Sequence, residues 1–188
     1  MTITESCIRR ILEMCKKNDR IAKLKCGTLS ARATIGELEA LAEELKKNIQ
    51  LSEHTKLQLK SSISYGHGFF PKIPWLAFVT EGRKVSNSIS VCLCFDRSGK
   101  GIVLGTMSYK QHIGQNYKTI YRSEDELTKV PLIKGSIHSN YGNKFFNPLT
   151  QSIDELSEKI IFEHIKNSIK LMSQITQKED PYIFKQNG

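Results

Sequence analysis

Residues 75–109 read WLAFVTEGRKVSNSISVCLCFDRSGKGIVLGTMSY, and this stretch decides the fold. Its first part, 75–80, is a short apolar run of the kind that forms a buried strand. Apolar and polar residues then alternate over 88–96, which is the period of a half-buried strand. A glycine-containing turn at 96–101 leads into a returning strand at 102–109. The stretch therefore predicts an antiparallel meander.

Segments of helical periodicity flank the predicted meander. Residues 4–17 place their apolar side chains on one helical face, and a basic link from Lys16 to Lys25 follows. Thr34-Ile35-Gly36-Glu37 has the pattern of a capping box, so we expect a second helix to begin there and to end near residues 49–51. Ser152-Ile153-Asp154-Glu155 repeats the pattern and predicts the start of a further helix.

These elements together predict an α+β fold, with a mostly antiparallel sheet flanked by helices and a helical N-terminal segment. We expect three parts along the chain. Residues 1–60 form a helical segment packed on or beside the core, and residues 61–178 form the main domain with its C-terminal helix. Residues 179–188 form a frayed tail.

The charge of the chain favours an anionic partner. Its 188 residues carry a formal net charge of +9, and residues 61–150 hold 11 Lys and Arg against 5 Asp and Glu. This excess favours nucleic acid over a membrane surface, although a basic surface that is merely solvated is the alternative. No apolar run approaches the roughly 20 residues that span a bilayer, and the N-terminus lacks the order of a signal peptide. A cytoplasmic protein is expected.

Neither the cysteine spacing nor a nucleotide-binding motif indicates that the chain is an enzyme. The five cysteines are odd in number and lack the spacing of a disulfide framework, so reduced structural thiols are expected. Cys92 and Cys94 alone make a weak zinc pair. There is no P-loop, and we predict no cofactor, metal site or catalytic residue. One enzymatic alternative is a Cys94 nucleophile with His67 or His112 as its base.

The segment 65–78, YGHGFFPKIPWLAF, contains the only Trp of the chain. A glycine-punctuated aromatic turn precedes an Ile-Pro-Trp step, and a polar, partly basic loop follows at 80–84. A large flat side chain beside a rigid backbone suits a surface that stacks a nucleobase and holds its phosphates. The alternative is that Trp75 is a core residue of the sheet.

Several short motifs occur at a recognisable spacing. They are Ser64-Tyr65-Gly66-His67-Gly68, Ile73-Pro74-Trp75-Leu76-Ala77-Phe78, Glu81-Gly82, Ser86-Asn87 and the strand Ile89–Phe95, with a weaker match at Asn140-Tyr141-Gly142-Asn143-Lys144-Phe145-Phe146. In these motifs the segment 62–109 resembles the N-terminal DNA-recognition domain of the McrB family of modification-dependent restriction proteins. The resemblance covers about half of the chain, and the first 55 residues show no match.

The resemblance implies a base-flipping pocket. In that family the domain is an α/β unit that binds DNA and flips a modified cytosine into a pocket. Trp75 and Tyr141 fall on pocket positions. Tyr65, His67 and Phe69 belong to the glycine loop, which the resemblance places near the vacated base stack.

Two positions of the pocket strand depart from the family. The best-known members carry Tyr and Leu where this chain has Ser90 and Cys94, both on the polar face of the 88–96 alternation. We therefore expect Ser90 and Cys94 to face the same cavity as Trp75, while the intervening apolar residues face the core. The smaller side chains predict a roomier cavity or the loss of base flipping. The basic residues expected to hold phosphates are Lys72, Arg83, Lys84 and Lys110. For each of the lysines, a solvated surface charge is the alternative.

The expected function is that of a DNA-binding specificity module in a modification-dependent restriction system. It would recognise modified cytosine, or another modified base, in double-stranded DNA. Extruding a base costs a few kcal/mol, which stacking and hydrogen bonds to the base can offset. The resemblance implies two further partners on other domains or chains, a GTPase motor and a nuclease subunit. The alternatives are a sequence- or structure-specific nucleic-acid binder without base flipping, and the Cys94 enzyme.

Overall fold

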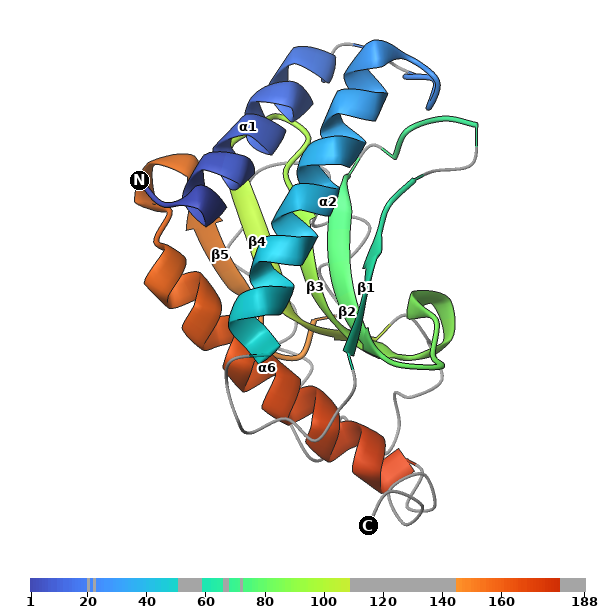
Figure 1. Ribbon diagram of the computed structural model, residues 1–188, viewed down its shortest axis with the longest axis vertical. Helices are drawn as coiled ribbons and strands as arrows, with labels where there is room; N and C mark the ends of the chain where they lie inside the picture. The colour runs from blue at the N-terminus through green and yellow to red at the C-terminus, as the bar shows by residue number, and fades with distance from the viewer. Residues whose placement is uncertain are drawn as a thin grey trace.

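A five-stranded antiparallel sheet organises the chain, and its strands lie side by side in sequence order (Figure 1). The computed structural model describes residues 1–19, 21, 23–50, 59–65, 68–71, 73–108 and 145–179. The predicted meander is confirmed and forms the centre of the sheet, with one further strand on each side. The strands are β1 (Leu59–Ile63), β2 (Trp75–Thr80), β3 (Ile89–Phe95), β4 (Gly101–Ser108) and β5 (Leu149–Ser152).

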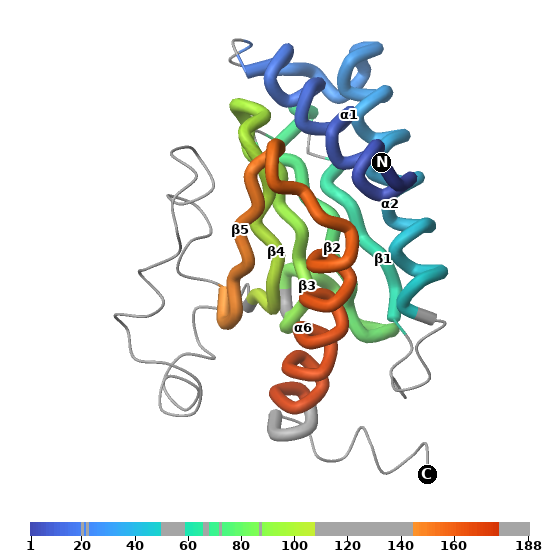
Figure 2. The backbone as a smooth tube through the Cα atoms, turned by 90° about the vertical axis from the view of Figure 1, so that its left-hand side faces the viewer, coloured from blue at the N-terminus to red at the C-terminus, as the bar shows by residue number. Residues whose placement is uncertain are grey.

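The α-helices of the described residues cover one face of this sheet (Figures 1 and 2). The first two form a hairpin, and the last helix follows β5 and packs against β3 and β4. This arrangement confirms the α+β fold class and the helical N-terminal segment. None of these helices is long and apolar enough to cross a membrane. The helices are α1 (Ile3–Asn18), α2 (Leu29–Gln50) and α6 (Glu158–Glu179), with short 3-10 turns at η1 (Val85–Asn87) and η4 (Ile153–Glu155).

The main hydrophobic core fills the space between the helices and the sheet. The four apolar residues of β3 that were predicted to face the core all belong to it. The same core takes a stripe of side chains at helical spacing from each helix, which is why the hairpin packs flat on the sheet. Its members include Ile8, Ile11, Leu12, Leu38, Leu41, Leu45, Ile89, Val91, Leu93, Phe95, Ile161, Ile165 and Ile169.

The predicted start of the second helix was wrong. α2 begins at Leu29, so Thr34 lies inside the helix, where its hydroxyl donates to the Ser30 carbonyl at 2.9 Å. The Thr28 hydroxyl instead accepts a hydrogen bond from the Ala31 amide at 3.3 Å and satisfies one of the free donors at the helix start. A capping pattern is a local signal, and here a second candidate earlier in the chain takes the role.

The predicted start of the C-terminal helix was also wrong. Ser152 ends β5, where it pairs with Gly101 of β4, and α6 begins only at Glu158. Of the four residues in the capping pattern, Ser152 therefore belongs to the sheet, and Ile153–Glu155 form the short 3-10 turn η4 ahead of α6. A capping box does occur at the start of α1, where the Thr2 hydroxyl accepts from the Glu5 amide at 3.2 Å.

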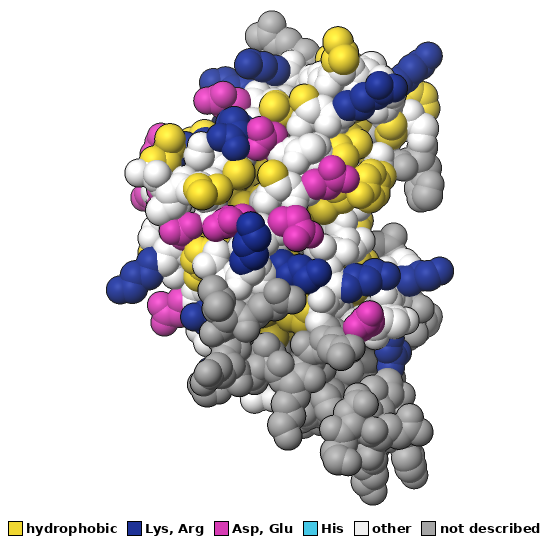
Figure 3. Space-filling model, viewed as in Figure 1, with side chains coloured by type: hydrophobic (Ala, Val, Ile, Leu, Met, Phe, Trp, Pro, Cys, Tyr) yellow, Lys and Arg dark blue, Asp and Glu magenta, His cyan; other side chains and the backbone are white. Residues whose placement is uncertain are grey.

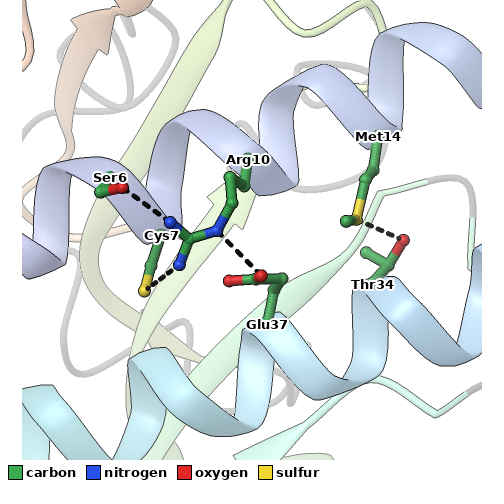
Figure 4. A network of polar contacts seen from close by, with 6 residues as sticks. All are labelled: Ser6, Cys7, Arg10, Met14, Thr34 and Glu37. Atoms are coloured by element: carbon green, nitrogen blue, oxygen red, sulfur yellow. Dashed lines mark hydrogen bonds and ion pairs between the residues drawn. The ribbon is translucent and has the colours of Figure 1, made fainter.

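A polar network joins α1 to α2 along their exposed side (Figure 4). The Arg10 guanidinium donates to Glu37 at 2.8 Å and to Ser6 at 2.7 Å, and it contacts the Cys7 sulfur at 3.2 Å. The Arg10 side chain is 46% exposed, so this ion pair contributes at most about 1 kcal/mol. The apolar stripe beneath it accounts for most of the stability of the hairpin.

The turn between β3 and β4 packs tightly on α1. The Asp96 carboxylate accepts hydrogen bonds from Ser98 and from the Lys100 amide, and Gly99 has a φ of +74°. A Cβ atom at Gly99 would lie 2.5 Å from the Leu12 carbonyl oxygen. The α1 helix and the centre of the sheet are therefore in backbone contact at this turn.

The opposite face of the sheet is also buried, which corrects the expectation of a half-buried strand. All seven residues of β3 are buried, including Ser90 and Cys94 of the predicted polar face. A second hydrophobic cluster covers that face. Its buried members are Ile73, Ala77, Cys92, Cys94, Val103, Met107 and Phe145, with Trp75 and Val85 packed against it.

Candidate nucleic-acid interface

Trp75 opens β2 at the edge of the second hydrophobic cluster. It is directly opposite Cys94 in the register of β2 with β3, and its side chain is partly buried. Its backbone is fixed on the other side by Ser64, whose hydroxyl accepts from the Trp75 amide at 2.9 Å and whose amide donates to the Trp75 carbonyl at 3.0 Å. The indole therefore lies on a rigid strand end, partly open to a ligand.

Ser90 lies on the same face of the sheet but at its other end. It precedes Cys94 by four residues, which at about 3.3 Å per residue separates the two Cα atoms by roughly 13 Å. Ser90 pairs with Met107 and is 1% exposed. Its hydroxyl has no hydrogen-bond partner among the described residues. Of the predicted pocket residues, only Cys94 is thus next to Trp75, and Tyr141 lies outside the described residues.

Cys92 and Cys94 form a buried thiol pair. Their sulfur atoms are 3.7 Å apart, and both residues are free cysteines. The contact with Cys94, together with burial, raises the pKa of the Cys92 thiol well above its usual range. Cys94 itself is 0% exposed, so a substrate in solution does not reach it in this conformation. His67 and His112, the bases considered for it, lie outside the described residues.

Exposed aromatic residues of the loop between β1 and β2 lie at the Trp75 end of the sheet. Tyr65 is 54% exposed and Phe69 is 45% exposed. Gly68, with a φ of +78°, turns the chain between them. Partial desolvation and a 3.1 Å hydrogen bond to the Glu39 carboxylate raise the pKa of the Tyr65 phenol. His67 and Lys72 of this loop lie outside the described residues.

The link between α1 and α2 pairs with this loop, a contact that no sequence pattern predicted. The Cys26 amide donates to the Gly68 carbonyl at 3.2 Å, and the Phe70 amide donates to the Leu24 carbonyl at 2.7 Å. The Lys23 ammonium lies 5.6 Å from the centre of the Phe69 ring, within the range of a cation–π contact. The N-terminal segment therefore contributes to the same surface as the glycine loop.

A small cavity lies behind this junction. Its volume is about 40 Å³, far below the roughly 300 Å³ of the smaller ligand sites, so it does not take a nucleobase in this conformation. Burial raises the pKa of the Cys15 thiol in its wall to about 12. The cavity lining includes Cys15, Leu24, Phe70, Pro71, Pro74 and Arg97.

Two of the predicted phosphate-binding residues lie away from these aromatic side chains. Arg83 and Lys84 follow β2, whose six residues separate them from Trp75 by about 17 Å or more. They are on the turn at the opposite end of the sheet (Figure 1). Lys110 lies outside the described residues. The two described members of the predicted phosphate-binding set thus lie together, away from Trp75.

Sequence reasoning missed basic residues that lie nearer to the aromatic loop. Figure 3 shows Lys and Arg side chains at the top of the molecule, where α1 ends and α2 begins. The sequence signal was the basic link from Lys16 to Lys25, whose position relative to the loop depends on the tertiary structure. The exposed basic residues of this region are Lys16, Lys17, Lys23, Lys25 and Arg32.

Within the described ranges, no group of three or more His, Cys, Asp or Glu side chains is arranged to hold a metal ion. No protein-family model matches the chain, and no curated protein sequence is significantly similar to it. The resemblance to the McrB family therefore stays a prediction from the motifs of residues 62–109 and the weaker match at 140–146.

Proposed function

We propose that the chain is a DNA-binding specificity module of a modification-dependent restriction system, and that it recognises modified cytosine in duplex DNA by flipping the base. The observation that carries this proposal is that three aromatic side chains lie at one end of the sheet, with Trp75 packed on the second cluster and Tyr65 and Phe69 on the side of the helix hairpin. Trp75 is partly open beside Cys94, and Tyr65 and Phe69 are exposed on the adjoining loop. Aromatic side chains on a rigid platform are what unstacked bases bind.

The electrostatics of the chain support a nucleic-acid partner. The formal net charge is +9, and cations occur at the aromatic end of the sheet, where Lys23 lies over Phe69. Phosphate contacts supply most of the affinity in such complexes, while base contacts supply the specificity. The resemblance further suggests that a GTPase motor and a nuclease subunit, on other domains or chains, act on the DNA that this module selects.

A second candidate is a sequence- or structure-specific nucleic-acid binder that flips no base. The burial of Ser90 and Cys94, at 1% and 0% exposure, favours it. If these side chains stay within the second hydrophobic cluster when DNA binds, they do not reach a base edge. The aromatic loop and the basic residues would then read the duplex from outside.

The single Trp of the chain allows a direct test. Tryptophan fluorescence, excited so that tyrosine does not contribute, reports on Trp75 alone, and a base stacked on the indole quenches it. We expect Trp75→Ala to reduce affinity for the preferred modified duplex by about 1–3 kcal/mol. Trp75→Phe, which keeps a ring against the second cluster, should be affected less. Circular dichroism must show both variants folded.

The duplexes should be matched in sequence and carry plain, methylated or hydroxymethylated cytosine. Base flipping predicts that the modified duplexes quench Trp75 more strongly and bind more tightly. Equal binding of all three without quenching would favour the second candidate. If Trp75→Ala unfolds while Trp75→Phe binds as the wild type does, Trp75 is a core residue and the pocket proposal fails.

A further inference from the structure

We propose that the corner where α1 meets α2 binds the phosphodiester backbone of the duplex that Trp75 reads, an inference that rests on the function proposed above. We call this surface the basic corner. It takes the role that sequence reasoning gave to Arg83 and Lys84. The five exposed residues that define it are Lys16, Lys17, Lys23, Lys25 and Arg32.

The basic corner is a structured surface because the two helix ends are tied together. The Ser30 hydroxyl at the start of α2 donates to the Asn18 side chain at the end of α1, at 2.9 Å. The Thr28 hydroxyl donates to the Lys25 carbonyl at 2.9 Å and closes the turn into α2. The Lys25 backbone is thereby tied to the start of α2, which reduces the entropy lost when its side chain binds phosphate.

The acidic group of the corner is already neutralised. Asp19 is the one carboxylate among the described residues from 16 to 32, and its Oδ1 lies 2.6 Å from Nε of Arg97. Arg97 also donates to the Asp19 carbonyl. The basic corner therefore keeps an excess of positive charge, with Glu13 as an exposed carboxylate one turn before Lys16 and Lys17 on α1. This net excess favours a polyanionic partner.

The basic corner is continuous with the aromatic loop. Lys25 forms a β-bridge with Phe69, so the link and the loop run side by side. The ammonium of Lys23, 5.6 Å from the Phe69 ring centre, lies beside an aromatic face that is itself exposed. A strand of DNA whose base stacks on an aromatic side chain here places its neighbouring phosphates against Lys23 and Lys25.

Acidic side chains limit the surface on one side. Glu39 and Glu43 are exposed further along α2, and Glu39 accepts the hydrogen bond from Tyr65. Carboxylates repel a phosphate backbone, so the duplex is expected to cross the end of the helix hairpin and not to run down the length of α2. This places the phosphates at the corner and the bases toward the loop.

The test compares two double variants of the full chain. Lys23→Gln with Lys25→Gln removes two positive charges from the basic corner. Lys166→Gln with Lys170→Gln removes two exposed charges from α6 and is the matched control. Affinity for plain and modified duplexes is measured by fluorescence anisotropy across a series of salt concentrations.

Each lost phosphate contact should lower the slope of log K against log salt by about 0.9, and the affinity near 0.1 M salt by roughly eightfold. We therefore expect the corner variant to lose about 1.8 from the slope and to weaken equally on plain and modified duplexes. The control should keep the wild-type slope. Thermal unfolding should show both variants to be as stable as the wild type.

Each other outcome overturns a defined part of this picture. A wild type that binds no duplex refutes the proposed function together with the role of the corner. Normal wild-type binding with an unchanged slope in the corner variant refutes the corner alone. A corner variant that loses preference for modified DNA, with its slope intact, makes these lysines base contacts. Loss of binding to anionic vesicles, but not to DNA, assigns the corner to a membrane.

A measurement on the unmutated protein gives independent support. Lysine acetylation followed by mass spectrometry, with and without saturating duplex, should show protection of Lys23 and Lys25. Lys166 and Lys170 should react equally in both samples. Equal reactivity of Lys23 and Lys25 with and without duplex would contradict the proposed contact.

Discussion

The contact between the β3–β4 turn and α1 gives a sharp prediction about stability. Gly99 has a φ of +74°, a conformation that L residues adopt only at a cost. In addition, a Cβ atom there would lie 2.5 Å from the Leu12 carbonyl oxygen and 2.8 Å from the Lys16 Cβ. Gly99→Ala therefore combines backbone strain with a collision against the helix backbone, which cannot move aside without undocking α1.

Gly82 provides a matched control in the same chain. Its φ of +78° is nearly that of Gly99, but a Cβ atom there meets nothing within 4 Å. Gly82→Ala thus carries the backbone strain alone. The difference between the two variants isolates the packing of the turn on α1.

The expected magnitudes follow from these two costs. Left-handed backbone at a non-glycine residue costs about 1–2 kcal/mol, which is the loss of unfolding free energy expected for Gly82→Ala. Overpacking adds about 1–3 kcal/mol, so Gly99→Ala should lose roughly 2–5 kcal/mol. Such a loss is a large share of the total stability of a typical domain, about 5–15 kcal/mol.

Urea denaturation followed by circular dichroism measures both variants. The midpoint should fall further for Gly99→Ala, with the m-value unchanged if unfolding stays two-state. A reduced m-value for Gly99→Ala would indicate that α1 has detached from the sheet before global unfolding. Equal destabilisation by the two substitutions would refute the contact between the turn and α1.

Two further predictions concern buried polar groups. Burial lowers the pKa of His164 below its ordinary value of 6.5, against the opposing hydrogen bond from its Nε2 to the Asn147 carbonyl at 2.7 Å. The native state then binds fewer protons than the unfolded state, so the free energy of unfolding should fall as the pH drops through 6.5. The variant His164→Gln should show a weaker dependence of this free energy on pH than the wild type. Ser90→Ala removes a buried hydroxyl that has no partner within the described part of the chain, so stability should change by less than about 1 kcal/mol in urea denaturation. Weaker binding of modified duplexes by this folded variant would place Ser90 against the flipped base, whereas unchanged binding would favour the binder without flipping.

Local periodicity in the sequence was enough to predict the centre of the fold. The strands at 75–80 and 89–95 were predicted within one residue of their observed ends, because their apolar runs and alternation record contacts on both sides of each strand. The helical face of residues 4–17 likewise predicted α1. These patterns arise from each segment meeting the core, so they can be read without knowing its neighbours.

The outer strands β1 and β5, and the starts of α2 and α6, could not be predicted from local periodicity. β1 and β5 have five and four residues, and their sequences LKSSI and LTQS show little alternation. They become strands because β2 and β4 offer unpaired backbone groups beside them. At Ser152 the pairing of β5 with β4 therefore prevails over the capping pattern. This pairing depends on residues distant in the sequence, so a short stretch of sequence does not reveal it.

The same distinction between local and long-range information applies to the candidate interface. The sequence by itself determined that Trp75 opens a rigid strand, that Cys94 and Ser90 share its face, and that the link after α1 is basic. Only the tertiary structure decided that Ser90 and Arg83 lie far from the indole, and that Lys23 lies over Phe69. The physical reason is that side-chain identity and strand period are local properties of the chain. The end of the sheet at which a loop lies is set instead by hydrogen bonds between segments that are distant in the sequence. The hydrogen bond from the Phe70 amide to the Leu24 carbonyl is one of these.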